Sequence, residues 1–314
     1  MNLVKNYAEE RGQEFDAENI INDIIENTGL LFVNKENKIQ FKHLSFQEYF
    51  TAYEIFHRNQ EERTLFVNAF NDPWWQNVAI FYAGMTKDSP KLIDEILQAS
   101  SPANFQQSVF NTLGIGKLLQ ALYNSPISDR IKGIERGLNN TILCINDICE
   151  VDDERTKLWR GFSKYNLMQI FGGVFSFSHW SVTLVNPLKQ TFSNIISQFS
   201  ENRSNQEQFE LEFKLFLICT ILSSEEFASF GEFRQLVENT KSPDLSLFAL
   251  EDMYIRKLYP RLSDTYKKSE EFIKIKRLIE RRRGQLGNIS KYVNAPVSDI
   301  KLMEKKENTI SLDI

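Results

Sequence analysis

The chain has few of the residues that build metal centres or disulfide frameworks. Its 314 residues include only three cysteines and three histidines. Cys144, Cys149 and Cys219 form no C-x-x-C pair and leave an odd count, which argues against a disulfide framework and a thiolate metal cluster. No two histidines lie at metal-ligand spacing with an acidic or cysteine partner. We therefore expect a protein of the reducing cytoplasm without a structural metal.

Long apolar runs are also missing. The longest spans residues 215–222, is interrupted by Thr220, and falls far short of the roughly 20 residues that cross a bilayer. The first residues, MNLVKNYAEERGQEF, contain no apolar core of a signal peptide. The sequence predicts no membrane association.

A phosphate-binding loop is missing as well. The pattern G-x-x-x-x-G-K-[ST] needs glycines for close backbone approach, a lysine for charge and a hydroxyl for magnesium. The nearest candidate, Gly116-Lys117, has Asn111 at the first glycine position and Leu118 at the hydroxyl position. The chain also lacks a G-x-S-x-G nucleophile motif. We expect no catalysis by this chain alone, and no cofactor bound by it alone.

Phenylalanine, by contrast, is abundant, with 25 residues against only 13 glycines and 8 prolines. Asp72-Pro73 and Asp88-Ser89-Pro90 place proline where the first helical residue tolerates it. Ser101-Pro102, Ser125-Pro126, Asn186-Pro187 and Ser242-Pro243 predict further helix starts. The amphipathic segments predict helices over 73–85, 90–99, 105–123, 127–138, 209–222, 225–238 and 245–258. The predicted fold is mainly α, an α-helical bundle or α-solenoid-like array.

The N-terminal pattern differs from the rest. Residues 16–28 predict a helix capped by Asp16 and stopped by Gly29. Residues 30–33 and 39–41 predict two short strands around a polar turn. A helix, a β-hairpin and a following helix, in this order, are typical of the last part of a winged-helix fold. Because the first helix is acidic, DNA phosphates would repel it.

The segment Phe41–Ala52, FKHLSFQEYFTA, is the most informative in the chain. Ser45 and Glu48 have the spacing of a capping box, in which each side chain bonds to the other's backbone N–H. The following aromatic residues share a helix face that we expect to pack against neighbours, and they are Phe46, Tyr49, Phe50, Tyr53 and Phe56. His43 lies just outside the predicted cap.

This segment, together with Asn71-Asp72-Pro73-Trp74-Trp75 and Ala83-Gly84, resembles the NACHT family of nucleotide-switched (STAND-type) signalling ATPases over residues 15–100. The resemblance implies a regulatory and sensor role, in bacterial defence or an innate-immunity-like pathway. It implies that His43 contacts the β-phosphate of ADP held by an upstream nucleotide-binding domain, with ADP or ATP and Mg as cofactors of an intact member. It also implies oligomerisation on activation.

Two other functions stay open. The chain could be a self-standing helical scaffold that binds proteins. Residues 256–306 hold fifteen Lys or Arg against six Asp or Glu, so their helix could also bind nucleic acid or an acidic partner. The possible basic patch is Lys274, Lys276, Arg277, Arg281, Arg282 and Arg283. The alternative is a solvated helix face with Lys-Glu pairs.

The remaining motifs favour structural roles. We expect Trp74 and Trp75 to pack in the core, His57 to stabilise a helix C-terminus, and His179 to be a loop or core residue. Gly172-Gly173 predicts a break, either a hinge or a tight turn. The predicted domains are residues 1–58, the end of a winged helix; 59–172 and 173–293, both helical; and 294–314, a flexible tail.

Overall fold

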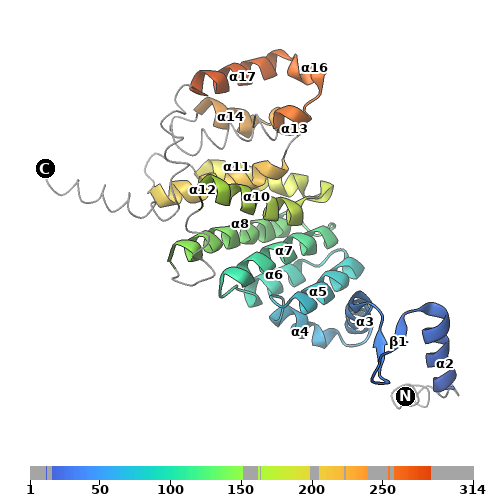
Figure 1. Cartoon of the computed structure of the whole chain (residues 1–314). Helices are drawn as coiled ribbons and strands as arrows, with labels where there is room; N and C mark the ends of the chain where they lie inside the picture. The colour runs from blue at the N-terminus through green and yellow to red at the C-terminus, as the bar shows by residue number, and fades with distance from the viewer. Residues whose placement is uncertain are drawn as a thin grey trace.

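The protein is mainly helical with one small antiparallel sheet, which confirms the predicted fold class (Figure 1). The computed structural model describes residues 12, 16–150, 162, 164–198, 205–222, 224–239, 254 and 258–283. The predicted tail, 294–314, and most of the predicted helix 245–258 lie outside the described residues.

The chain's described part begins with a helix and a hairpin, in the predicted order. Helix α2, Ala17–Asp23, continues into the π-helix η1, Ile24–Thr28. The Asp16 carboxylate accepts hydrogen bonds from the backbone N–H groups of Glu18 and Asn19 and caps the helix. Gly29, with φ 65°, ends the helical segment in the left-handed conformation that glycine tolerates.

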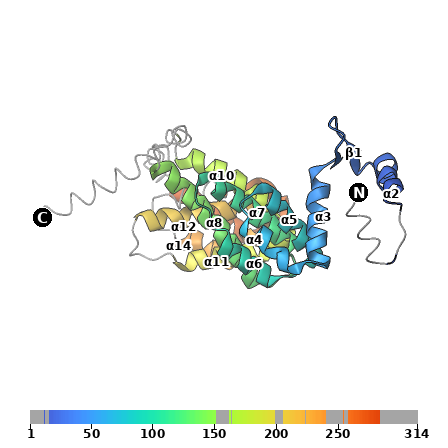
Figure 2. The same ribbon diagram turned by 90° about the horizontal axis from the view of Figure 1, so that it is seen from below.

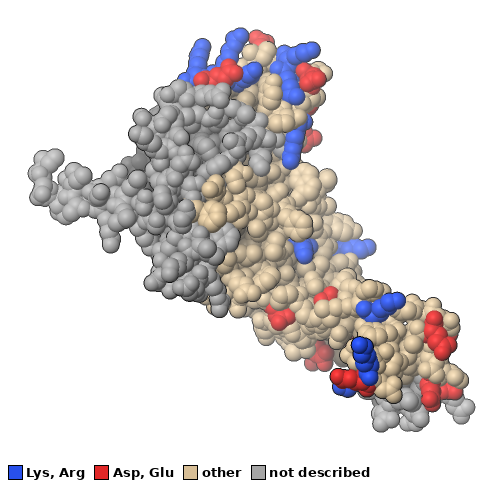
Figure 3. All heavy atoms as spheres, in the orientation of Figure 1, with Lys and Arg blue, Asp and Glu red and all other residues tan. Residues whose placement is uncertain are grey.

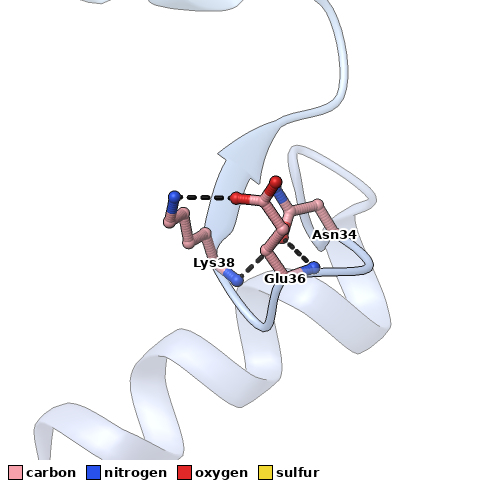
Figure 4. A network of polar contacts seen from close by, with 3 residues as sticks. All are labelled: Asn34, Glu36 and Lys38. Carbon is pink, nitrogen blue, oxygen red and sulfur yellow. Dashed lines mark hydrogen bonds and ion pairs between the residues drawn. The ribbon is translucent and has the colours of Figure 1, made fainter.

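Strands β1, Leu31–Val33, and β2, Ile39–Phe41, pair antiparallel. The Asn34 side chain holds the turn between them by accepting from the backbone N–H groups of Glu36 and Lys38, each at 2.9 Å (Figure 4). Asn37 adopts φ 62°, which an asparagine tolerates in a tight turn.

Most other helices form a stack. Its elements are α3 Leu44–His57, η2 Gln60–Glu62, α4 Arg63–Asn68, α5 Pro73–Thr86, α6 Pro90–Ala99, α7 Phe105–Ala121, α8 Ile127–Glu150, α10 Lys164–His179, η3 Val182–Leu184, α11 Val185–Gln198 and α12 Asn205–Ile221. Helix α3 packs on α5, α5 on α7, α7 on α8 and α10, and α10 on α12. Figure 2 shows α3 at the edge of this stack, with the hairpin and α2 beyond it.

The last described helices lie at the other end of the molecule from α2 (Figure 1). They are α13 Glu225–Ala228, α14 Gly231–Asn239, η5 Tyr259–Arg261, α16 Asp264–Lys267 and α17 Glu270–Arg283. Phe227 anchors this end, because its ring contacts Phe192 of α11 and Phe233 of α14 at centroid distances of 5.2 and 5.1 Å. The single helix predicted over 225–238 is wrong, because the segment forms two helices, α13 and α14.

Three predicted proline starts, at Pro73, Pro90 and Pro126, are confirmed. Helix α11 begins at Val185, before Asn186-Pro187, so that predicted start is wrong, and Ser242-Pro243 lies outside the described residues. Pro73 and Pro90 open α5 and α6, and Asp72 caps α5 through the N–H groups of Trp74 and Trp75. The Ser101-Pro102 start is wrong, because α7 begins at Phe105 behind the Asn104 cap. Helix α8 runs twelve residues beyond the predicted end at 138.

The predicted break at Gly172-Gly173 is wrong, since helix α10 continues through both residues. A Cβ atom at Gly172 would lie 3.0 Å from Thr220 Cγ2 and 3.2 Å from Phe216 Cε1. This glycine therefore lets α10 and α12 approach closely. The division of the chain into domains stays a prediction.

Candidate functional site

His43 occupies the N-cap position of α3, not a position outside the cap. Its backbone is extended, with φ −127° and ψ 136°, and its side chain makes no capping hydrogen bond. The His43 carbonyl accepts from the Phe46 N–H at 3.1 Å. The imidazole is exposed and meets the Phe46 ring edge-on at 5.8 Å between centroids. The helix thus fixes the backbone of His43 and leaves its ring open to solvent.

The predicted capping box is wrong. Because α3 begins at Leu44, Ser45 lies inside the helix instead of at its cap. Glu48 points the other way: it is only 4% exposed, and its Oε1 accepts from Asn77 Nδ2 of α5 at 3.0 Å. The carboxylate therefore joins α3 to the stack.

The predicted packing of the aromatic face of α3 is confirmed in part, because the rings of Phe56 and Tyr49 meet Tyr82 and Phe81 of α5 at centroid distances of 5.6 and 5.7 Å. The side chains of α3 buried toward the stack are Glu48, Ala52 and Ile55. Tyr49, Phe50 and Tyr53 remain 38%, 43% and 42% exposed. We call these three residues the α3 aromatic surface.

Ring contacts connect this surface along α3. Phe50 stacks on Phe41 of the hairpin at 5.9 Å, and Tyr53 lies 4.2 Å from the ring of His57. His43, Phe50 and His57 are spaced by seven residues, which places them on one side of a helix. An exposed histidine therefore lies at each end of a partly exposed aromatic face.

The predicted roles of the other aromatic and histidine residues fit the structure. Trp74 and Trp75 are partly buried and pack against the core. His57 is the last residue of α3. His179 ends α10 and is fully buried, with its ring stacked on Phe175 at 4.1 Å and its Nδ1 2.7 Å from Ser178 Oγ. Burial lowers the pKa of His179 to about 3.

Gly116-Lys117 lies in the interior of α7 and forms no phosphate loop. A Cβ atom at Gly116 would clash with the backbone oxygen of Ser178, and one at Gly137 would lie 2.9 Å from His179 Nε2. Both glycines let α7 and α8 close around the end of α10. Their role is helix packing.

A buried polar network in the stack was not predicted. Asn111 donates to Asn71 Oδ1 at 2.7 Å and to the Ser100 carbonyl at 2.9 Å, and its own Oδ1 accepts from Asn140 at 2.8 Å. It joins the segment before α5 to α7 and α8. Asparagines at these positions resemble surface residues in sequence, so no signal in the pattern distinguishes them.

The two cysteines whose side chains are described, Cys144 and Cys219, are buried and unreactive. Burial raises the pKa of Cys144 to about 12 and raises that of Cys219 well above its usual value. Within the described part of the chain, no three His, Cys, Asp or Glu residues group as metal ligands. No described helix is long and apolar enough to cross a membrane.

The predicted basic patch is only partly assembled. Lys274, Arg277 and Arg281 line one groove beside α14. Lys276 does not line it and instead lies 3.8 Å from Glu280 and 5.8 Å from the Tyr259 ring centroid. The side chains of Arg282 and Arg283 lie outside the described residues.

No protein-family model, curated protein or solved structure matches this chain. The resemblance to the NACHT family therefore depends on the motif residues alone.

Proposed function

We propose that this chain is the regulatory portion of a NACHT-type nucleotide-switched signalling ATPase, acting in the cytoplasm in bacterial defence or a related innate-immunity pathway. The helix–hairpin–helix segment would be the end of its winged-helix domain. The helical stack would sense the trigger or hold the resting state closed. Catalysis would belong to a nucleotide-binding domain, with ADP or ATP and Mg bound there.

The observation that carries the proposal is the position of His43. A side chain that contacts a ligand held by another domain must be exposed and have a fixed backbone. His43 meets both conditions at the start of α3. The adjoining α3 aromatic surface offers apolar area that a neighbouring domain would bury.

The first experiment is the mass of the native polypeptide in its source cell, by immunoblot and intact mass spectrometry. The proposal expects a product larger by at least about 150 residues, the size of a nucleotide-binding domain. A native product of 314 residues would overturn it.

The second experiment compares two exposed histidines of the same helix in that native polypeptide. His43→Leu should lower ADP affinity at least about tenfold, as expected for loss of a charge-assisted phosphate contact. His57→Leu, at the far end of α3, should retain ADP. Equal ADP retention by both variants, measured by chromatography of released nucleotide, would contradict the role of His43.

A self-standing protein-binding scaffold is the second candidate, and a specific feature favours it. Phe177, Trp180 and Val182, at the junction of α10 and η3, are 78%, 54% and 84% exposed. Exposed aromatic residues of this kind anchor protein interfaces. A native polypeptide without an ATPase domain would favour this scaffold function over the first proposal.

A further inference from the structure

A groove with basic and apolar lining runs beside α14 and α17. Its volume is about 910 Å³. Ile273, with a partly exposed side chain, and Leu278 give it apolar surface. Figure 3 shows lysine and arginine side chains gathered at the end of the molecule that carries α16 and α17.

Three cations of α17 face this groove without a partner in the described structure. Lys274, Arg277 and Arg281 follow at three- and four-residue spacing, so one helix face presents them over about 10 Å. By contrast, the groove's Arg234 lies 3.2 Å from Glu271. These three cations, together with Lys268, which also lines the groove, are available to bind anions from outside.

The groove suits carboxylates on a peptide better than a nucleic-acid backbone. Glu238, Glu270 and Glu271 also line it. These carboxylates would repel a continuous row of phosphates. Apolar surface beside ordered cations matches an acidic amphipathic helix, which inserts apolar side chains and pairs its carboxylates at the rim.

The chain itself contains such a helix. The segment α2–η1 carries four isoleucines and four carboxylates, with no lysine or arginine, between residues 16 and 28. None of its described side chains is buried. Because α2 and α17 lie at opposite ends of the molecule, α2 does not reach the groove of its own chain (Figure 1).

We propose that the α2–η1 segment of one copy binds the α14–α17 groove of a second copy, so that the protein associates head to tail. Each copy then presents a free segment and a free groove, so the contact propagates into a chain or closes into a ring. One helix in one groove buries a small area, so the association is weak, in the micromolar range. It involves neither His43 nor nucleotide.

The test is sedimentation equilibrium of the full chain over a concentration series at low and high salt. The wild type should associate at low salt and dissociate as salt is added, because ion pairs orient the contact. Arg277→Glu/Arg281→Glu and Glu18→Lys/Glu26→Lys should each weaken association by at least about tenfold. The matched control is Lys87→Glu/Lys117→Glu, which changes the charge equally on α5 and α7 surfaces and should associate as the wild type does.

Mixing the two defective variants shows whether the segment and the groove bind each other. The groove variant keeps an intact α2, and the α2 variant keeps an intact groove, so the mixture should regain association that neither shows alone. A mixture that stays monomeric, or a wild type monomeric at about 0.1 mM, would overturn the proposal. So would tight binding of a single-stranded RNA oligonucleotide that Arg277→Glu/Arg281→Glu abolishes, since the groove would then bind nucleic acid.

Discussion

The N-terminal region, residues 16–57, which includes helix α3 of the stack, and the rest of the stack, residues 63–222, differ in how far most of their phenylalanines are buried. In the stack, phenylalanines such as Phe66, Phe70 and Phe175 are fully buried. In the N-terminal region, Phe32 and Phe50 are substantially exposed. The stack is therefore stabilised by its own core, whereas the N-terminal region carries apolar surface that its own fold does not cover.

The burial of a phenylalanine decides whether it contributes mainly to folding or leaves apolar surface exposed. Buried phenylalanine contributes to folding in proportion to the apolar area removed from water. Partly exposed aromatic side chains contribute less to folding and keep that area for association. Substitutions in the two regions should therefore affect stability and binding differently.

The largest expected difference is between two phenylalanines. Phe66→Ala should destabilise the protein by about 4 kcal/mol, because a fully buried ring is lost and a cavity remains. Phe50→Ala should cost only about 1 kcal/mol, because its ring is already partly in water. Urea unfolding followed by circular dichroism measures both, and equal losses would contradict the comparison.

Glycine packing within the stack gives the next effect. Gly116→Ala should cost about 3 kcal/mol, because the new Cβ would clash with the Ser178 carbonyl oxygen. Gly173→Ala is the control, since nothing lies within 4 Å of its Cβ position in α10. It should stabilise the protein by up to about 1 kcal/mol through higher helix propensity. A destabilised Gly173→Ala protein would show that α10 is not regular at this residue.

These glycines also mark how far the sequence could predict the fold. The sequence predicted the helix starts at Asp16 and Asp72 and the helix end at Gly29, because helix capping depends on residues that are neighbours in sequence. The sequence predicted a hinge or a tight turn at Gly172 and gave Gly116, inside a predicted helix, no packing role, because close helix approach depends on residues far away in the chain. The residues adjacent to Gly116 and Gly172 in the sequence do not indicate that these glycines contact Ser178 and Phe216.

A pH effect of about 2 kcal/mol should come from His179. The unfolded chain binds a proton on this histidine below its ordinary pKa of 6.5, whereas the folded protein binds it only near its lowered pKa of about 3. The unfolded state thus binds more protons between these values, so stability falls as pH falls from 6.5 toward 3 and is unaffected above that window. Between pH 7 and 5 the loss should reach about 2 kcal/mol.

The control for this pH dependence is His179→Leu, which removes the titrating group and keeps an apolar side chain of similar size. Between pH 7 and 5 the free energy of unfolding of this variant should fall by about 2 kcal/mol less than that of the wild type. Carboxylates contribute equally to both proteins and cancel. Identical slopes would show that His179 accepts a proton in the folded state.

The candidate site was less predictable than the fold. The sequence located His43 at the start of a helix, because the aromatic periodicity after it is local. It assigned Glu48 to a capping box and not to the stack, since the burial of a carboxylate depends on a partner in another helix. In the structure Glu48 is buried on the same side as Ala52 and Ile55 and accepts a hydrogen bond from Asn77 of α5.

The smallest predicted effect tests that orientation of α3 directly. Glu48→Ala should cost about 1–2 kcal/mol, because a buried hydrogen bond to Asn77 is lost. Glu48→Gln should retain most of the stability, since its amide oxygen still accepts from Asn77. Ser45→Ala should change stability by less than about 0.5 kcal/mol, because Ser45 is exposed inside the helix and caps nothing.

Thermal unfolding of the three variants distinguishes this arrangement from a capping box. In a capping box both Ser45 and Glu48 satisfy backbone N–H groups at the helix start, so Ser45→Ala would cost about 1 kcal/mol and lose most of its effect in a Glu48→Ala background. In the arrangement described here only Glu48 contributes, through its contact with α5. A stable Ser45→Ala protein beside a weakened Glu48→Ala protein would show that Glu48 contributes through its contact with α5 and that Ser45 does not cap α3.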